Sequence, residues 1–386
     1  MSSRRAVRLA LWLATSVYGS ALAGQESESL TVPAGFEASV FAERLEGPRG
    51  LAFGPGGDLY VTLTRRGSVV RLIDADGDGR ADSTVSVIEG LDRPSGIAWR
   101  GQELWIAETG RVVRLHRAAI EARAAPPPPE VVIDSLPAGG QHFTRTIVFD
   151  PSGRYVLVSI GSSCNVCREE DPRRAAIVRY PVRGGSGGGA RGGRGGGGGG
   201  GEVLARGLRN AVGLAFNPET GELWATDNGR DWLGDDLPPD EVNAVHRGRN
   251  YGWPECYGNR VPDPEYGSPA RCAGTEPPIL TLPAHNAPLG IAFYTGSAFP
   301  EEYHGDAFIA LHGSWNRSVR SGYKVVRVRV RSGRPVATQD FVSGWLTRGG
   351  LVWGRPVQPL VGPDGALYLT DDYGGRIWRI AYEGQR

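Results

Sequence analysis

Residues 208–240 read LRNAVGLAFNPETGELWATDNGRDWLGDDLPPD, and this stretch contains the pattern on which the fold depends. One apolar run at 212–216 ends in turn-forming residues at 217–221, and a second run follows at 222–226. Short apolar runs bounded by Asn, Pro and Gly predict β-strands. The acidic loop that comes next, 227–241, is the kind of segment that carries function on a rigid scaffold. The stretch therefore predicts two neighbouring strands followed by a functional loop.

The same pattern of two apolar runs joined by a turn recurs along the chain. Together with 209–226 there are six copies, the others at 49–62, 94–107, 146–153, 287–293 and 356–370. A third strand follows most copies, at 68–72, 111–115, 176–180, 323–328 and 376–380. Repeated short strands with Pro and Gly turns indicate propeller blades. We predict an all-β, six-bladed β-propeller with four-stranded antiparallel blades, formed as one domain by residues 24–386. A sandwich or two small barrels would not explain one phrase recurring throughout.

The first 23 residues have the composition of an export signal. Arg4, Arg5 and Arg8 precede a short apolar run at 9–17, and Ala21-Leu22-Ala23 is a cleavage signal. We predict a signal peptide at 1–23 and a periplasmic or secreted protein, the alternative being a membrane anchor or buried strand. No later stretch is apolar enough to span a membrane.

Composition adds two expectations about the mature chain. Its formal charge would fall from +1 to −2 once the signal is removed, which gives no support for nucleic-acid binding. Residues 184–201 are almost entirely glycine and predict a flexible surface loop.

Four cysteines suggest two local disulfides, because an even number in an oxidising compartment usually pairs. Cys164 and Cys167 are three residues apart, and Cys256 and Cys272 share one loop region. A c-type haem would need histidine where Arg168 stands, and structural zinc would need a second close pair. Redox activity of the first pair is the remaining alternative.

The acidic segment 74–82 resembles an EF-hand loop. Asp74, Asp76, Asp78 and Asp82 occupy positions 1, 3, 5 and 9, and Gly79 occupies position 6. Position 12 is Val85 instead of a glutamate, which predicts modest calcium affinity. A solvated acidic turn is the alternative.

Basic residues precede the first strand of each predicted blade, where they would gather at one end of the central channel. They are Arg49, Arg93, His142 with Arg145, Arg209 with Asn210, His285 with Asn286, and Arg355. As a set they predict an anion-binding pocket, although each alone is compatible with a polar rim.

Several motifs together resemble the soluble glucose/sorbosone dehydrogenase family of quinoproteins. They lie at 139–145, 160–165, 207–210, 240–243, 250–254 and 312–317, and the resemblance covers nearly the whole mature chain. It implies a six-bladed enzyme that uses pyrroloquinoline quinone (PQQ) and Ca²⁺ to oxidise an aldose-type sugar or sugar aldehyde. The residues at 161–165 and 313–317 are more similar to those of the sorbosone branch.

The resemblance also implies roles for individual residues. His142 matches the general base, and Arg209 with Asn210 matches the pair that contacts the quinone oxygens. The loop that contains Gly229, Arg230 and Asp240 matches the calcium-binding turn.

Two further arginines, Arg317 and Arg355, are expected to bind cofactor carboxylates, since guanidinium groups suit carboxylates. In this sequence Ser162 occupies the region of an aspartate that orients the base in glucose-oxidising members, and Thr295 is the nearest match to a cofactor lysine.

Two other functions remain compatible with the sequence. A calcium-dependent lactone hydrolase would need acidic metal ligands near the channel, where this chain is basic. A non-catalytic scaffold would leave His142 and Arg209 as rim residues. As an oxidoreductase without a haem motif, the protein would need an external electron acceptor.

Overall fold

The computed structural model describes residues 29–122, 128–182 and 200–384. The predicted signal peptide at 1–23 lies outside these ranges, as does the glycine-rich segment 184–201 except for its last two residues. Within the described ranges no helix combines the length and apolar character needed to cross a membrane.

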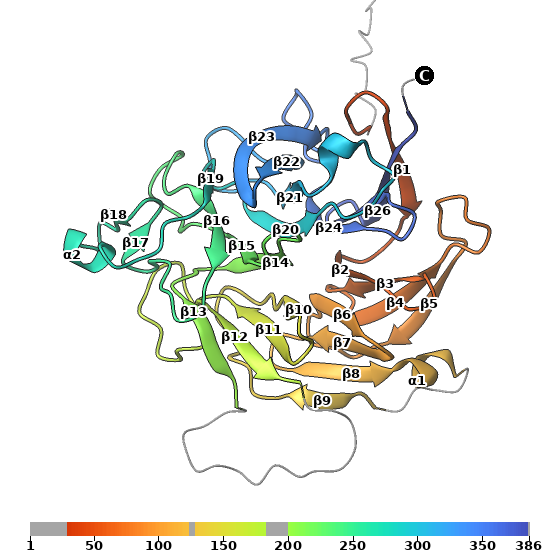
Figure 1. Cartoon of the computed structure of the whole chain (residues 1–386), viewed down its shortest axis with the longest axis horizontal. Coiled ribbons are helices and arrows are strands. Elements are labelled where there is room, and N and C mark those ends of the chain that lie inside the picture. Colours follow the sequence, from red (N-terminus) through yellow and green to blue (C-terminus); the bar gives the residue numbers. More distant parts are fainter. Residues whose placement is uncertain (1–28, 123–127, 183–199, 385–386) are drawn as a thin grey trace, which may run out of the picture.

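The described residues form six four-stranded antiparallel sheets arranged in a ring (Figure 1). Each innermost strand contacts the innermost strands of both neighbouring sheets, so the ring is closed. The predicted six-bladed propeller is therefore confirmed. From the innermost strand outward, the blades are β2 (Pro48–Phe53), β3 (Leu59–Leu63), β4 (Ser68–Ile73) and β5 (Ser83–Ile88); β6 (Gly96–Arg100), β7 (Glu103–Ala107), β8 (Val112–His116) and β9 (Glu130–Ile133); β10 (Ile147–Phe149), β11 (Tyr155–Ile160), β12 (Ala176–Pro181) and β13 (Glu202–Arg206); β14 (Ala211–Phe216), β15 (Leu223–Asp227), β16 (Asp240–Val245) and β19 (Leu280–Leu282); β20 (Pro288–Phe293), β21 (Ala307–Leu311), β22 (Lys324–Arg331) and β23 (Arg334–Val342); β24 (Pro356–Val361), β25 (Leu367–Asp371), β26 (Arg376–Tyr382) and β1 (Phe36–Ala42).

The sixth blade joins two distant parts of the chain. Its outermost strand is β1, which pairs antiparallel with β26 from Phe36 opposite Tyr382 to Val40 opposite Trp378. The repeat does not predict this strand, because β1 carries none of the recurring phrase. The pairing closes the ring with backbone hydrogen bonds.

A glycine in the repeated phrase lets adjacent blades approach closely. A Cβ at Gly213 would lie 2.3 Å from the carbonyl oxygen of Leu289 in the next blade. The Thr226 hydroxyl completes this junction, since it accepts a bond from the Gly213 amide at 2.8 Å and donates to the Leu289 carbonyl at 2.6 Å. Equivalent close approaches occur at Gly50, Gly96 and Gly290.

The hydrophobic core is divided among the junctions between blades. Six clusters of buried residues each join two neighbouring sheets within the described chain. Trp224 is typical, because it is fully buried and packs edge-on against Phe293 of the next blade at 5.1 Å. Each blade is thus stabilised by the apolar surface it shares with its neighbours.

The remaining elements are short and lie outside the blades. They are α1 (Arg117–Glu121), β17 (Cys256–Tyr257), β18 (Val261–Pro262), α2 (Pro269–Cys272) and the 3₁₀ helix η1 (Glu301–Tyr303). Both predicted disulfides are formed, Cys164–Cys167 in the third blade and Cys256–Cys272 between β17 and α2.

Candidate functional site

A cavity of about 330 Å³ lies at the end of the axis where the innermost strands begin. It is bounded by residues that precede innermost strands and by loops that follow second strands. Its lining residues are Arg49, Gln141, His142, Phe143, Thr144, Arg209, Asn210, Val212, Asn228, Gly229, Asp231, Asp240, His285, Ala287, Leu289, His312, Trp315 and Asn316. Val212 and Leu289 also pack against Val357. The cavity therefore has an apolar contact at its base and polar groups around its wall.

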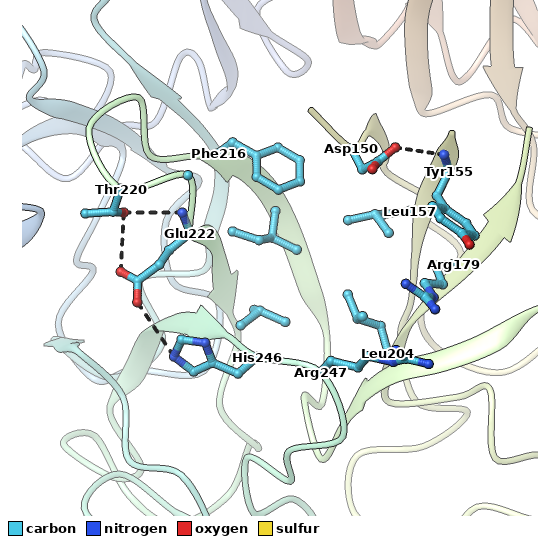
Figure 2. Close-up of a pocket in the computed structure, with 13 residues that line it drawn as sticks. Asp150, Tyr155, Leu157, Arg179, Leu204, Phe216, Thr220, Glu222, His246 and Arg247 are labelled. Atoms are coloured by element: carbon cyan, nitrogen blue, oxygen red, sulfur yellow. Dashed lines mark hydrogen bonds and ion pairs between the residues drawn. The ribbon is translucent and has the colours of Figure 1, made fainter. Parts of the chain in front are cut away.

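A second cavity, of about 360 Å³, lies at the opposite strand ends between the third and fourth blades. Figure 2 shows that several of its polar groups bind one another. The Glu222 carboxylate faces both the Thr220 hydroxyl and His246, and the Asp150 carboxylate accepts a bond from the Tyr155 amide. Arg179 and Arg247 bind Glu202 instead. Because these groups are already paired, the axial cavity is the better candidate for a functional site.

His142 is held in one orientation by the loop that follows β11. Its Nδ1 lies 2.8 Å from the carbonyl oxygen of Ser162 and 3.0 Å from the Ser162 hydroxyl. A carbonyl can only accept, so Nδ1 carries the proton and Nε2 keeps a free lone pair. Burial, followed by the charge of Arg209, lowers the pKa of His142 to about 3. The imidazole is therefore neutral and able to accept a proton.

The guanidinium of Arg209 is bound on all three nitrogens. Nε donates to the Asn165 carbonyl at 2.9 Å, and Nη1 donates to the Asn228 carbonyl at 3.2 Å. Nη2 donates to the Asn165 side-chain oxygen at 2.9 Å and to the Asp231 carboxylate at 3.2 Å. Arg209 is only 5% exposed, so it is a fixed cation in the wall of the cavity.

The Cys164–Cys167 loop bonds both to the residue that orients His142 and to Arg209. The Ser162 hydroxyl, which faces His142, donates to the Cys164 carbonyl at 2.6 Å. The next residue, Asn165, binds Arg209 through both its carbonyl and its side chain. One short disulfide-closed loop therefore positions the candidate base and the candidate cation together.

A second histidine faces the cavity and was not assigned a role from the sequence. The Nε2 of His312 lies 2.9 Å from the Asp372 carboxylate, which also binds Arg49 at 3.2 Å. Burial alone would raise the pKa of Asp372, but His312 and Arg49 reverse this and lower it to about 2. Asp372 therefore stays ionised and offsets the charge of Arg49. Both His312 and Asp372 follow second strands, a position that ends at the same face as the predicted basic residues.

The other predicted basic residues have different surroundings. Arg145 is fully buried and donates to the carbonyls of His142, Thr144 and Pro137. Arg93 lies 5.0 Å from the Phe143 ring, outside the cavity lining, whereas His285 lines the cavity.

The two arginines expected at cofactor carboxylates lie just outside the lining. Arg355 donates to the His312 and Gly313 carbonyls, and Arg317 donates to the Asp235 carbonyl and the Asp236 carboxylate. The structure thus brings Arg49, His142, Arg209, Asn210 and His285 to one cavity, but not Arg93, Arg145, Arg317 or Arg355.

The loop predicted to bind calcium lies beside the cavity. The Asp240 carboxylate accepts bonds from the Gly229 and Ala287 amides, both at 2.9 Å, and burial raises its pKa to about 7. The Arg230 side chain turns away to Asp263 and Glu265. Within the described residues no hydrogen bond ends on the carbonyl oxygens of Gly229 or Arg230, so both oxygens are available to a hard cation.

The EF-hand-like loop is exposed and brings three carboxylates together. Those of Asp74, Asp76 and Asp78 lie within 4.8 Å of one another. Asp82 instead accepts a bond from the Ala75 amide at 2.7 Å. The loop therefore brings together three of the four predicted carboxylates.

The axial cavity combines positive charge, unpaired hydrogen-bond acceptors and a close backbone approach. Among the described residues, the Oδ1 atoms of Asn210 and Asn316 are buried without a hydrogen-bond partner. A Cβ at Gly161 would lie 2.6 Å from both Asn210 Oδ1 and His142 Cβ, so only glycine fits beneath them. Arg49 and Arg209 supply positive charge. These residues fit PQQ, which is a planar tricarboxylate.

The fold and the cavity define a class of protein, the six-bladed propellers with a polar ligand cavity on the axis. The chain belongs to the TrAA12-like family, whose model matches residues 30–383. An uncharacterized protein of Borreliella burgdorferi is 31% identical over 370 residues, which cover 92% of each chain.

Several relatives have names that describe an activity, including the following two dehydrogenases. Aldose sugar dehydrogenase YliI of Escherichia coli is 28% identical over 255 residues, covering 63% of this chain and 60% of YliI. The pyrroloquinoline quinone-dependent pyranose dehydrogenase of Coprinopsis cinerea is 26% identical over 360 residues, covering 79% of this chain and 46% of that one. The chain thus spans less than two thirds of either named dehydrogenase. The predicted resemblance to PQQ-dependent sugar dehydrogenases is confirmed.

Solved structures share the fold. The calcium structure of a Trichoderma reesei carbohydrate-active enzyme of family AA12 has a TM-score of 0.77 at 22% identity, covering 92% of this chain and 97% of that one. The holo form of the PQQ domain of the Coprinopsis cinerea pyranose dehydrogenase has a TM-score of 0.75 at 23% identity, covering 92% and 98%.

Proposed function

We propose that this protein is a PQQ- and Ca²⁺-dependent dehydrogenase that oxidises an aldose-type sugar or sugar aldehyde, with His142 as general base. The observation that carries the proposal is that His142 and Arg209 line the same cavity. A neutral imidazole of fixed tautomer and a fixed guanidinium line one cavity of a propeller whose named relatives are sugar dehydrogenases.

His142 and Arg209 have separate tasks in this proposal. Bound PQQ would supply the two-electron acceptor for hydride from the sugar carbon. The Nε2 of His142 accepts the proton of the sugar hydroxyl, and the Ser162 carbonyl stabilises the resulting imidazolium through Nδ1–H. The charge of Arg209 favours negative charge on oxygen atoms in the cavity, and its many bonds hold it in place beforehand.

The remaining cavity residues would hold the cofactor and the metal. Asn210 and Arg49 would bind polar edges of PQQ, and the carbonyls of Gly229 and Arg230 would be ligands for Ca²⁺. Asp240 orients that loop through the Gly229 amide. Ser162 thus takes over, largely through its backbone, the orienting task of the aspartate found in glucose-oxidising relatives.

A thermal-shift titration followed by a dye-reduction assay tests the proposal. PQQ with CaCl₂ added to the apoprotein at a hundred times the dissociation constant would stabilise it by about 2.7 kcal/mol, and removal of calcium with a chelator would reverse most of this. Aldoses would then reduce a redox dye. A melting temperature that PQQ and calcium leave unchanged would indicate a non-catalytic scaffold, and lactone cleavage without dye reduction would indicate a hydrolase.

The cellular setting is also part of the proposal. We place the protein in the periplasm or outside the cell, on the basis of residues 1–23 and the two disulfides. Its electrons would pass to an external acceptor, because Arg168 replaces the histidine of a haem-attachment motif.

A further inference from the structure

Two tryptophans with unusual exposure lie at the mouth of the axial cavity. Trp232 is 68% exposed and Trp315 is 65% exposed, and their rings pack edge-on with centroids 5.2 Å apart. Trp315 lines the cavity, whereas Trp232 lies beyond it on the loop after β15. Their contact and position are informative, because contiguous exposed apolar surface beside a cavity marks interaction sites, whereas single exposed apolar residues do not.

The backbone at Trp232 is strained as well. Its φ is +72°, the left-handed region that suits glycine. For a residue with a side chain this conformation costs about 1–2 kcal/mol. Backbone strain of this kind occurs often at ligand-binding segments, and at this position glycine would relieve it.

Hydrogen bonds fix the two tryptophans relative to each other. Asn316 donates to the Asp231 carboxylate at 3.1 Å, and the Ser318 amide donates to Asp235 at 3.0 Å. Arg317 adds bonds to the Asp235 carbonyl and to Asp236. The loop after β15 and the loop after β21 thus form one joined rim, which carries both indoles.

We propose that Trp232 and Trp315 form an outer carbohydrate subsite, which binds the second sugar unit of an oligosaccharide whose reducing end is at His142. This inference rests on the proposed function. Trp315 lines the same cavity as His142, and Trp232 packs against Trp315 from outside the lining, so the pair lies next to a sugar held at His142. A pyranose ring with equatorial hydroxyls has a flat face of C–H groups that packs on an indole.

The test is Trp232→Gly, which separates a binding role from a structural one. Because glycine relieves the positive φ, the variant should keep or raise the melting temperature while it loses the stacking surface. The holoprotein is assayed by dye reduction with glucose, cellobiose and cellotriose. We expect the ratio of KM for cellotriose to KM for glucose to rise about tenfold with kcat unchanged. Trp232→Phe should recover part of that change, and Val319→Ala, which alters an exposed residue of the β21 loop, is the control.

Calorimetric titration with methyl β-cellobioside, whose anomeric hydroxyl is blocked, reads out the subsite without turnover. We expect wild-type protein to bind it about tenfold more tightly than Trp232→Gly. If no sugar reduces the dye, the proposed function fails, and this titration still decides the subsite. Equal binding by the two proteins, or equal KM changes for all three sugars, would overturn the inference. The inference would also be overturned if Trp232→Gly reduced cytochrome c more slowly than wild type with unchanged KM values for the sugars. That result would make the tryptophan pair a docking surface for an electron carrier.

Discussion

Replacing Asn165 with alanine tests whether the disulfide loop positions Arg209. The Asn165 side chain makes three hydrogen bonds, accepting from Arg209 Nη2 at 2.9 Å and from the Asp231 amide at 2.8 Å, and donating to the Asp231 carbonyl at 3.2 Å. Two neutral bonds of about 0.5–1 kcal/mol and one charge-assisted bond of about 1.5 kcal/mol give a loss of about 3 kcal/mol in unfolding free energy. Loss of the bond to Arg209 should also lower kcat/KM by roughly 10- to 100-fold.

Asn217→Ala is a matched control in the neighbouring fourth blade, which also carries Arg209. The Asn217 side chain also makes three hydrogen bonds, to the Glu219 and Thr220 amides and the Gly333 carbonyl, but it lies at the opposite end of β14 from the cavity. Urea unfolding should show losses of similar size for both variants, and dye reduction should fall only for Asn165→Ala. Unchanged kcat/KM in Asn165→Ala, or an equal fall in Asn217→Ala, would refute the positioning role.

Three further predictions follow from residues described above. His142→Ala should fold and bind PQQ, as judged by thermal shift, while kcat falls about 10²- to 10⁴-fold; full turnover would remove His142 from its role. Since the pKa of His142 is lowered to about 3 in the folded chain, the unfolded chain takes up a proton below pH 6.5 that the folded chain does not. Stability should therefore decrease as pH falls from 6.5 towards 3, by up to about 1.4 kcal/mol per pH unit, and His142→Asn should flatten urea-unfolding profiles in that range. Gly213→Ala, whose Cβ would meet the Leu289 carbonyl at 2.3 Å, should lower unfolding free energy by about 1–3 kcal/mol, whereas Gly221→Ala places its Cβ in open space and carries only the local cost of a positive φ.

The blades could be predicted because their signal is local and repeated. Each copy combines an apolar run, a turn and a glycine such as Gly213, and the structure explains the glycine by the carbonyl of the next blade. β1 could not be found in this way, since its partner is more than 300 residues away and its sequence is unlike the phrase. Long-range pairing leaves no periodic trace in either strand.

The site was predictable in position but not in side-chain direction. His142 and Arg209 line the cavity as expected for residues that precede innermost strands. Arg145 occupies an equivalent place, yet its guanidinium turns inward to backbone carbonyls, a choice that only packing decides. The basic pattern does not predict His312 and Asp372, because it concerns residues before innermost strands, whereas these two follow the second strands β21 and β25, which end at the same face.

The pairing of β1 with β26 has a consequence for assembly. The ring closes through its first and last strands, so it cannot close until the last blade has been synthesised. Residues 36–42 therefore stay unpaired while the first five blades form. During that interval the unpaired edges of the sixth blade are exposed to other chains. Deleting residues 36–42 should therefore leave the edge of β26 unpaired and cause aggregation, an effect far larger than that of removing a flexible terminus.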